Sequence, residues 1–484
     1  MSILSNIMPR TLLHCSKGLD SCKELTKQVK AFNKRAKHGK IKVKKANRDN
    51  PYAIEIISKD KDVHKKNHND FLKEIENNPE VTIFHDHNHP LSQKGSNNAP
   101  YFKQGRFKPH IRYATNQVRD LLNHTPTYLA QYYNYPPQQG TPPTIAIISL
   151  GGTYLTSDLN HYWTTVLGFK GSQIPSVTYV AVDGVTNAPN QSIKPDDGSD
   201  ENTLDIEIIG GMCPGCKIVV YFAPNSTKGF YDAIAAAMFD AKNQPSVISI
   251  SWGGPEDFSS ISELNAYNQL LQLTKKPITV AAGDDGCADT INDGNPHVDF
   301  PASSPYVIAC GGTSVTVASE TVWSWDSVTK SGTGGGISAR FVQPTYQANM
   351  FNYTPINTDP TLGVLVGNRG VPDVALNANP NTGWTIFYNG KLLTNSVGGT
   401  SASAPAMAAL IGRMNLPRKT QFNISLYQAY LKNSASFKDI TIGTNDGLQG
   451  STGVYSAKIG YDFCTGLGSP NGTLLFNTLK ALIK

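Results

Sequence analysis

A serine within a run of small residues is the most specific chemical signal in the sequence. Residues 398–405 read GGTSASAP, and the apolar run AMAALIGRM follows. Small side chains allow Ser401 to lie in the first turn of a helix with its hydroxyl open to a cleft, where free N–H groups and the helix dipole stabilise a developing oxyanion. An ordinary N-cap on a closely packed helix has the same pattern, so this run alone leaves both interpretations open.

Two acidic patterns could serve such a serine. Glu201 and Asp205 are four residues apart in ENTLD, so both carboxylates lie on one face of a helix. Asp284 follows the apolar run ITVAA at 278–282, and the carboxyl tip of a strand is a frequent place for catalytic groups. Taken singly, a solvated acidic helix start and an Asp-Gly turn also explain these residues.

Short apolar, β-branched runs predict the strands that would position these residues. They lie at residues 144–150, 177–182, 217–223, 247–252, 278–282 and 306–312. Helical segments separate them, for example at 202–212 and 228–242. This alternation predicts an α/β fold with one doubly wound, mostly parallel sheet, whose loops at the carboxyl ends of the strands carry the chemistry. Upstream we expect a strand at 81–84 and a helix at 115–122.

Composition places the chain among globular proteins. It has 484 residues, 39% hydrophobic and 17% charged, which suffices for a large core and an accessory segment. There is no run of about 18 apolar residues, so we expect no transmembrane helix. The N-terminus lacks a clean apolar stretch ahead of its charges, so we expect no secretory signal.

Charge divides the chain into two unequal parts. Residues 1–120 carry 24 Lys and Arg against 12 Asp and Glu, a net charge of +12, which leaves −6 for the rest. A polar linker is expected at 91–110, between a basic segment at 1–105 and a domain at 106–484. The basic segment should dock on the acidic domain. Nucleic acid is the rival partner, but no known reader motif supports it.

The seven cysteines include one CxxC pair, Cys213 and Cys216. No second pair stands at zinc spacing, so a structural zinc site is not expected. A local disulfide and two buried thiols both remain open.

From about residue 111 to the end, the chain resembles the sedolisins, the serine-carboxyl peptidases, and among them the kumamolisin-like group. The matching stretches, in the family's order, are ENTLDIEIIGGMCPGCKIVVYFAPN, SISWGGPED, AAGDDG, HVDFPASSPYV, GGTSASAP, DITIGTND and YDFCTGLGSPNG. The resemblance implies a subtilisin-like fold, preceded by a small α+β prosegment, and an endopeptidase that acts at acidic pH. It makes Ser401 the nucleophile, Glu201 the general base, Asp205 its partner and Asp284 the acid of the oxyanion hole.

The scarcity of histidine agrees with a carboxylate base. Of 11 His, only His161 and His297 lie beyond residue 125, and neither is in a strand-tip motif. A Glu of ordinary pKa accepts a proton from serine only where it is ionised, and Asp284 donates a hydrogen bond only when protonated. Both requirements favour acid.

The resemblance also implies substrate and metal sites. The edge that would pair with an extended peptide is Ser251, Trp252, Gly253 and Gly254, and the facing loop is 334–336. Asp299 matches a pocket acid that would favour Arg or Lys before the cleaved bond, although a loop cap is its simpler role. One calcium ion would be held by oxygen ligands alone. These are the carboxylates of Asp439 and Asp462 and the backbone carbonyls of Ile440, Lys458 and Gly460.

The sequence therefore predicts an acid-acting serine-carboxyl endopeptidase that is made as a proenzyme. Its expected partners are a peptide or protein substrate and its own prosegment, without nucleic acid or membrane, and it should be a monomer. We expect acid to loosen the prosegment so that the linker is cut, with Lys103, Arg106 and Lys108 as candidate positions. The resemblance favours secretion or an acidic compartment. The alternative function is a catalytically silent peptide-binding protein on the same fold.

Overall fold

The structure is a computed structural model. It describes residues 10–15, 19–35, 41–45, 53–58, 71, 81–85, 107–114, 123–188, 198–291, 293–326, 330–351, 369–417, 420–447 and 454–483. The helix predicted at 115–122 and most of the linker predicted at 91–110, including Lys103 and Arg106, lie outside these ranges.

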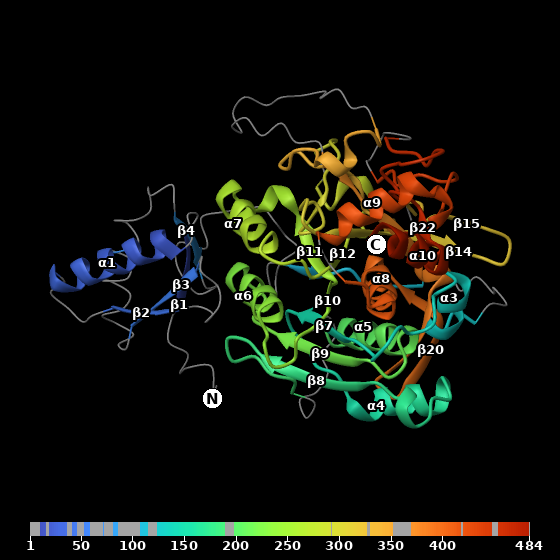
Figure 1. The fold of residues 1–484 in the computed structure, drawn as a ribbon, viewed down its shortest axis with the longest axis horizontal. Helices are drawn as coiled ribbons and strands as arrows, with labels where there is room; N and C mark the ends of the chain where they lie inside the picture. The colour runs from blue at the N-terminus through green and yellow to red at the C-terminus, as the bar shows by residue number, and fades with distance from the viewer. Residues whose placement is uncertain are drawn as a thin grey trace.

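An eight-stranded sheet forms the centre of the larger part (Figure 1). Its order is β15-β14-β12-β10-β7-β9-β8, with β18 also paired to β14. All pairs are parallel except β14 with β15. The strands are β7 (Thr144–Ser149), β8 (Ser176–Ala181), β9 (Lys217–Phe222), β10 (Val247–Ile250), β12 (Ile278–Ala281), β14 (Ile308–Val315), β15 (Glu320–Val322) and β18 (Val374–Asn377). The predicted doubly wound, mostly parallel sheet is confirmed.

Helices cover both faces of this sheet, which explains why its strands are apolar throughout. In β7, Ile145 and Ile147 belong to the core under α5 (Ser199–Met212) and α8 (Thr400–Met414). Ala146 and Ile148, on the opposite face, belong to the core under α6 (Thr227–Met238) and α7 (Ile261–Leu271). All four side chains are fully buried. The helices that carry the candidate catalytic residues, α5 and α8, pack directly against each other.

Several predicted boundaries differ from the structure. The strand predicted at 306–312 is Ile308–Val315, and the helix predicted at 202–212 begins at Ser199. The strand predicted at 247–252 ends at Ile250, and Trp252 begins a separate strand, β11 (Trp252–Pro255). β11 leaves the parallel sheet and pairs antiparallel with β13 (Asp299–Phe300) and β5 (Lys108–Pro109). The helix predicted at 228–242 ends at Met238, where Phe239 leaves helical geometry. The apolar pattern of this run continues through Trp252. It does not show that the chain leaves one sheet after Ile250 and pairs with other strands from Trp252 onward.

The remaining elements surround this centre. Among them, β19 and β20 form a hairpin that joins β6 and leads into α8. The helices are α3 (Pro126–Tyr132), α4 (Thr156–His161), α9 (Phe422–Lys432) and α10 (Gly472–Ile483). The strands are β6 (Arg112–Tyr113), β16 (Gly336–Ile337), β17 (Gly370–Val371), β19 (Trp384–Tyr388), β20 (Lys391–Gly398), β21 (Phe437–Lys438) and β22 (Ser469–Pro470).

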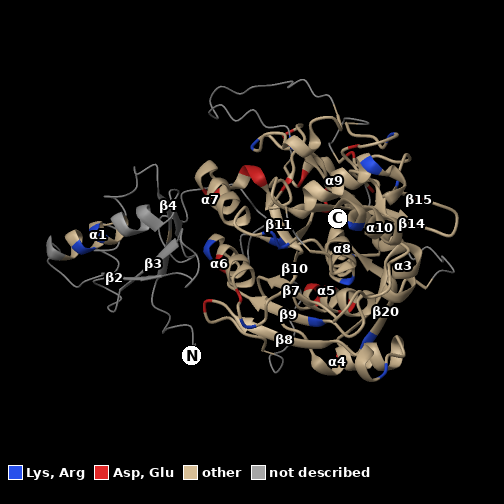
Figure 2. Cartoon of the chain, in the orientation of Figure 1, with Lys and Arg blue, Asp and Glu red and all other residues tan. Residues whose placement is uncertain are grey.

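The N-terminal segment forms a small α+β unit beside the larger part (Figure 1). Its antiparallel sheet has the order β2-β3-β1-β4 and packs against α1 (Leu19–Arg35), on which basic side chains are marked in Figure 2. The strand predicted at 81–84 is β4, which lies against α6 and α7. The strands are β1 (Arg10–Cys15), β2 (Ile41–Lys45), β3 (Ala53–Ser58) and β4 (Val81–His85).

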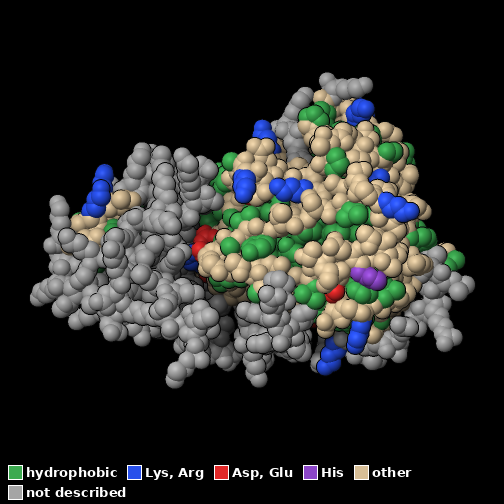
Figure 3. Space-filling view, turned by 90° about the horizontal axis from the view of Figure 1, so that it is seen from below, with side chains coloured by type: hydrophobic (Ala, Val, Ile, Leu, Met, Phe, Trp, Pro, Cys, Tyr) green, Lys and Arg blue, Asp and Glu red, His purple; other side chains and the backbone are tan. Residues whose placement is uncertain are grey.

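On the face shown in Figure 3, hydrophobic and basic side chains are interspersed with polar surface. Within the described ranges, every helix is too short or too polar to cross a membrane.

Candidate active site

The helix α5 supplies two buried acids. It begins after Gly198, whose φ of +87° turns the chain into the helix, and Glu201 lies in its first turn. The helix N-terminus favours a negative charge at that position. Glu201 and Asp205 are both fully buried, with relative exposures of 0%. The predicted i,i+4 pair is therefore an interior pair of carboxyl groups and not a solvated helix start.

Ser401 is the second residue of α8 and faces this pair. The strand β20 ends at Gly398, and Gly399, with φ +98°, makes the sharp turn into the helix. The hydroxyl of Ser401 donates a 2.9 Å hydrogen bond to Oε2 of Glu201. The backbone N–H of Ser401 lies in the first turn, where it has no partner within the helix. The serine thus has a carboxylate acceptor at its hydroxyl and a backbone donor that the helix itself does not use.

The polar chain continues from Glu201 to Asp205 and Ser251. The hydroxyl of Ser251 donates to Oδ1 of Asp205 over 2.8 Å. Burial raises the pKa of Glu201 well above its ordinary value, and the nearby charge of Asp205 raises it further. Burial also raises the pKa of Asp205, although hydrogen bonds from Ser251 and Glu201 act against this. Because the two carboxyls are buried and interact, their titration belongs to the pair and not to either residue alone.

Asp284 lies across the cleft, just beyond the end of β12. Its Oδ1 accepts hydrogen bonds from the backbone N–H and the hydroxyl of Thr400, each 2.8 Å long. Its Oδ2 is buried and has no hydrogen-bond partner among the described residues. Because Oδ1 is engaged only as an acceptor, Oδ2 is the oxygen that can carry a proton and donate it to a neighbouring group.

The cleft is filled by residues 107–114 of the chain's own linker. The strand β5 pairs antiparallel with β11, so that Lys108 lies opposite Gly253 and Pro109 opposite Trp252. The N–H of His110 donates to the carbonyl of Ser251 over 3.1 Å. The carbonyl of His110 accepts from the N–H of Ser401, also over 3.1 Å. The backbone of this segment is therefore held in the extended form in which a peptide adds to a strand edge, with His110 next to Ser401.

The oxyanion position is defined by Gly399. A Cβ atom at this residue would lie 2.7 Å from Oδ2 of Asp284 and would overlap the carbonyl oxygen of His110. Both oxygens therefore lie beside the same point of the backbone, close to the N–H of Ser401. Only glycine leaves room for a substrate carbonyl here, and Asp284 and the Ser401 N–H are its two candidate donors.

The side chain of His110 lies beside the carboxyl group of Asp299. The imidazole is fully buried, and its Nε2 lies 3.1 Å from Oδ2 of Asp299. Burial lowers the pKa of His110 to about 3 and raises that of Asp299 well above its ordinary value. Gly253 leaves room for Asp299, because a Cβ there would collide with its carboxyl group. Gly254 holds the strand of Asp299 by pairing with Phe300, and the pocket role that the resemblance implies for Asp299 stays a prediction.

Further contacts hold the linker on both sides of His110. Lys108 forms an ion pair with Asp285, and Arg112 donates to the same oxygen, Oδ2, over 3.1 Å. The Arg112 guanidinium also lies 3.6 Å from Oδ2 of Asp284. Tyr113 donates to Asp200 over 2.8 Å. In the sequence alone, Asp285 has no signal for a role except its place beside Asp284 in AAGDDG.

The loop predicted to face β11 also borders the cleft. Gly334 donates to the carbonyl of Gly283, and a Cβ at Gly334 would overlap the carbonyl of Ala282. Glu256, which follows β11, accepts hydrogen bonds of 2.8 Å from the Ser338 hydroxyl and the Ala339 N–H. These bonds connect the strand on one side of the cleft to the loop on the other.

The two histidines of the C-terminal part have partners away from Ser401. The ring of His161 packs on Phe387, with centroids 4.3 Å apart. His297 lies between Asp257 and Asp293, at 2.7 and 3.0 Å. Neither occupies the place of a catalytic base.

Cys213 and Cys216, the CxxC pair, are free buried thiols. The alternative of a local disulfide is therefore not what the structure contains.

The loops that carry the predicted calcium ligands come together near the C-terminus. The N–H of Gly460 donates to Oδ2 of Asp439 over 2.9 Å, and the N–H of Lys458 donates to Oδ2 of Asp462 over 3.2 Å. Two carboxylates and the carbonyls of both loops give an oxygen-only donor set, which suits calcium. Ile440, the remaining residue of the predicted calcium site, follows Asp439 in the chain and is buried. In the described ranges, no three His, Cys, Asp or Glu side chains gather as a metal site, so backbone oxygens would have to supply the remaining ligands.

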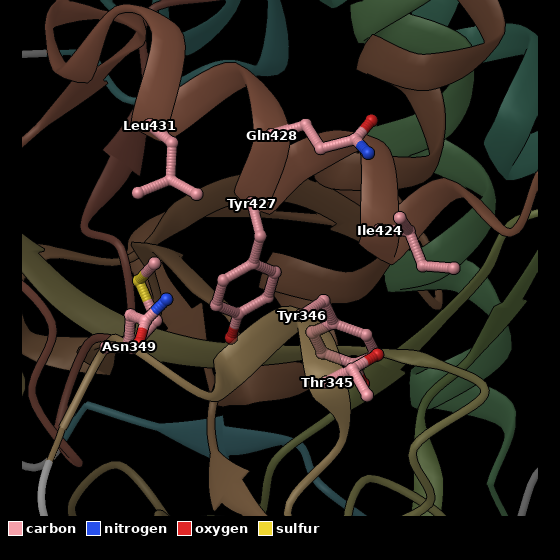
Figure 4. A pocket seen from close by; sticks show the side chains of 8 residues that line it. Thr345, Tyr346, Asn349, Ile424, Tyr427, Gln428 and Leu431 are labelled. Carbon is pink, nitrogen blue, oxygen red and sulfur yellow. The ribbon is translucent and has the colours of Figure 1, made fainter.

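A separate pocket lies between α9 and residues 345–350 (Figure 4). Tyr346 and Tyr427 form its floor, and the Tyr427 hydroxyl is bound to the buried carboxylate of Asp373 over 2.7 Å. Its lining is uncharged, and it does not include the residues around Ser401.

Comparisons with known proteins agree with this geometry. The profile described as Subtilase family matches residues 185–461. Kumamolisin from Bacillus sp. (strain MN-32) is 42% identical over 394 residues, which cover 78% of this chain and 68% of that protein. The chain belongs to the sedolisins, within the kumamolisin-like group. It is a serine-type peptidase of that family, and the alternative of a silent binding protein finds no support.

More distant sedolisins match a smaller share of their own length. Sedolisin from Pseudomonas sp. (strain 101) is 28% identical over 353 residues, which are 67% of this chain and 56% of that protein. Tripeptidyl-peptidase sed5 from Aspergillus fumigatus is 29% identical over 60% of this chain and 53% of its own length. The structure of Pseudomonas sedolisin, solved with two molecules of pseudo-iodotyrostatin, aligns with a TM-score of 0.59 and 28% identity. It covers 74% of this chain and 98% of the solved chain, which confirms the subtilisin-like fold.

Proposed function

We propose that the protein is an acid-acting endopeptidase in which Ser401 is the nucleophile, Glu201 the general base, Asp205 its partner and Asp284 the acid of the oxyanion hole. One observation carries the proposal. Ser401 donates its hydroxyl proton to Glu201 while its backbone N–H binds the carbonyl of a peptide bond that lies in the cleft. The substrate is a peptide or protein segment bound in extended form along β11.

The arrangement supports a two-step hydrolysis. Ser401 Oγ attacks the carbonyl carbon and its proton passes to Glu201, while the oxyanion is stabilised by the Ser401 N–H and the protonated Oδ2 of Asp284. Glu201 then gives the proton to the leaving amine, and the C–N bond breaks. Water then attacks the acyl-enzyme and gives its proton to Glu201, which returns a proton to Ser401 Oγ as the acyl group leaves. In both steps Asp205 stabilises Glu201 through the interaction of the two carboxyl groups.

We expect acid to favour this mechanism, because a carboxyl group donates a hydrogen bond to an oxyanion only in its protonated form. The Glu201–Asp205 pair must keep one negative charge to accept the serine proton. Burial raises the pKa of Glu201 well above its ordinary value, and the charge of Asp205 raises it further. The kcat/KM should therefore fall on the acidic side as this pair becomes fully protonated.

We propose that the chain is a proenzyme, residues 1–105 being the prosegment, and that the maturation bond joins His110 to Ile111. The linker runs through the cleft, and His110 O is bound by the N–H of Ser401. Lys108 lies two residues upstream of this position, paired with Gly253, so a cut after Lys108 would require the linker to slide. The cut after His110 needs no such movement.

The acid release of the prosegment depends on groups other than Asp285. Burial alone would raise the pKa of Asp285, but Lys108 and Arg112 outweigh it and lower the pKa to about 2. Its ion pairs with the linker are thus complete above about pH 4 and are lost only as the pH falls toward 2. Cleavage of the linker, and not neutralisation of this contact, is what would free the cleft.

We propose one calcium ion as a structural ligand, held by Asp439, Asp462 and the carbonyls of Ile440, Lys458 and Gly460. The ion would supply a positive charge that joins the two loops and no chemistry at Ser401.

The full chain, moved from neutral buffer to pH 4, tests the proposed function. Mass spectrometry should show a new N-terminus at Ile111, with Ser401→Ala remaining intact. Ser403→Ala is a matched control, because this serine lies on the same helix and binds the Leu376 carbonyl. It should be processed normally. Processing of Ser401→Ala at the wild-type rate would refute the nucleophile, and a cut elsewhere would refute only the maturation bond.

A further inference from the structure

The bound linker shows which side chains the cleft faces. Residues 107–110 are extended, so alternate side chains point to opposite sides. Lys108 and His110 point toward the acids Asp285 and Asp299. Phe107 points the other way and packs edge-on against Phe230, with ring centroids 4.6 Å apart. One side of a bound peptide therefore meets carboxylates and the other meets apolar surface.

The register of this peptide is fixed at both ends. At the downstream end, His110 is held by its two backbone hydrogen bonds in the cleft. At the upstream end, Asn225 accepts from the N–H of Phe107 over 2.9 Å and donates to its carbonyl over 2.6 Å. A side-chain amide that binds both backbone groups of one residue holds the strand without regard to its side chain. Lys108 is thereby placed opposite Asp285.

Asp285 is prepared for a cation at this position. Its backbone bridges to Gly332, and the N–H of Gly286 donates to the Gly332 carbonyl over 3.0 Å, so the loop is fixed on both sides of the acid. The exposed fractions of the Asp285 and Lys108 side chains are 17% and 22%, so their ion pair is only partly screened by solvent. Burial would raise the pKa of Asp285, but Lys108 and Arg112 lower it to about 2, so this carboxylate remains ionised above about pH 4.

We propose that Asp285 is a specificity-determining residue, which selects substrates with Lys or Arg at the third residue before the cleaved bond. The inference rests on the proposed function and on the register that places His110 before that bond. It concerns a subsite distinct from the Asp299 pocket, since Asp299 meets the residue next to the bond and Asp285 the residue two positions upstream.

Internally quenched peptides based on the linker, Phe-Xaa-Pro-His-Ile-Arg, test this with the acid-activated full chain. With Lys, Gln or Glu as Xaa, wild-type kcat/KM should be about 10-fold higher for Lys than for Gln, which is typical of a partly exposed charge-assisted bond. In Asp285→Asn the preference should fall to within about twofold, while Asp285→Lys should prefer Glu. The charge-matched control Asp183→Asn, which alters an acid paired with Lys228, should keep the wild-type preference.

The outcomes separate the two proposals. If wild type cleaves the peptides but Asp285→Asn keeps the preference for Lys, or if wild type shows none, the subsite assignment is overturned and the peptidase stands. If Ser401→Ala cleaves as fast as wild type, the proposed function fails. Arg112 donates to the same oxygen of Asp285. A second series therefore varies the Arg position, and a preference confined to that position would also overturn the assignment.

Discussion

Replacing Gly399 by alanine tests the geometry of the oxyanion position directly. The added Cβ would stand 2.7 Å from Oδ2 of Asp284 and closer still to the carbonyl oxygen of His110, whereas real Cβ atoms essentially never come within 3.0 Å of another heavy atom. The carbonyl must therefore retreat by about 1 Å, a misplacement that can cost roughly 10²-fold in rate. Retreat also stretches its 3.1 Å bond to the Ser401 N–H, and loss of one oxyanion donor costs about 10²–10³-fold.

Backbone strain is a second effect of the same substitution. Gly399 has φ +98° and ψ 162°, a region that essentially only glycine adopts, so a residue with a Cβ costs roughly 1–3 kcal/mol in stability. Gly390, in the turn between β19 and β20, has φ +72° and nothing within 4 Å of an added Cβ. Gly390→Ala therefore carries backbone strain without the collision. Both variants should lose stability, but only Gly399→Ala should lose activity.

The assay is the rate at which the full chain is cut at pH 4, followed by mass spectrometry, together with thermal unfolding of each variant. We expect Gly399→Ala to be processed at least about 10²-fold more slowly than Gly390→Ala. Processing of Gly399→Ala within about threefold of Gly390→Ala would show that the linker carbonyl does not occupy this position. That result would also refute the assignment of this position to the substrate oxyanion.

Glu201→Gln should lower processing by about 10⁴-fold at every pH, because an amide cannot accept the serine proton, and an intact acid-treated chain is the expected result. Asp299→Asn should reduce kcat/KM for peptides with a basic residue before the cleaved bond more than for peptides with Gln there. A chelator in excess should lower the thermal midpoint if calcium binds at Asp439 and Asp462, and an unchanged midpoint with no metal on elemental analysis would remove the site. Burial alone would lower the pKa of His297, but bonds to two Asp raise it to about 9. Its stabilisation is thus complete below about pH 6.5 and lost toward pH 9, a decline in urea midpoint that His297→Gln should lack.

The sequence predicts most of the fold because the buried strands are nearly continuous apolar runs. The runs at 144–150 and 217–223 became β7 and β9 with boundaries within a residue, since both faces of each strand are covered by helices. It misplaces the end of the run at 247–252, because the apolar side chains of Ile248, Ile250 and Trp252 recur at every second residue, yet Trp252 pairs with a different set of strands. The local pattern of apolar residues predicts which side chains are buried, but it does not predict which strand pairs with which.

For the site, the sequence identifies residues that lie in motifs and misses those that act through distant contacts. Ser401, Glu201, Asp205 and Asp284 were found because their surroundings resemble a family. Asn225 was not, because its partner Phe107 is 118 residues away, and nothing near either residue marks the pair. The chemical role of a lone polar residue becomes visible only when the chain segment that it binds is placed beside it.

The linker in the cleft has a consequence for how activation proceeds in time. Because the proposed inhibitor is covalently part of the chain, its local concentration does not change on dilution, and processing within one chain should follow first-order kinetics at any protein concentration. After the cut, the upstream piece still holds the pairing of β5 with β11 and the bonds to Asn225. Its dissociation is a separate first-order step, whereas its rebinding is bimolecular. Onset of activity toward other substrates should therefore lag behind cleavage, and the fraction of enzyme that stays blocked by rebinding should fall on dilution, while cleavage itself keeps a constant half-time.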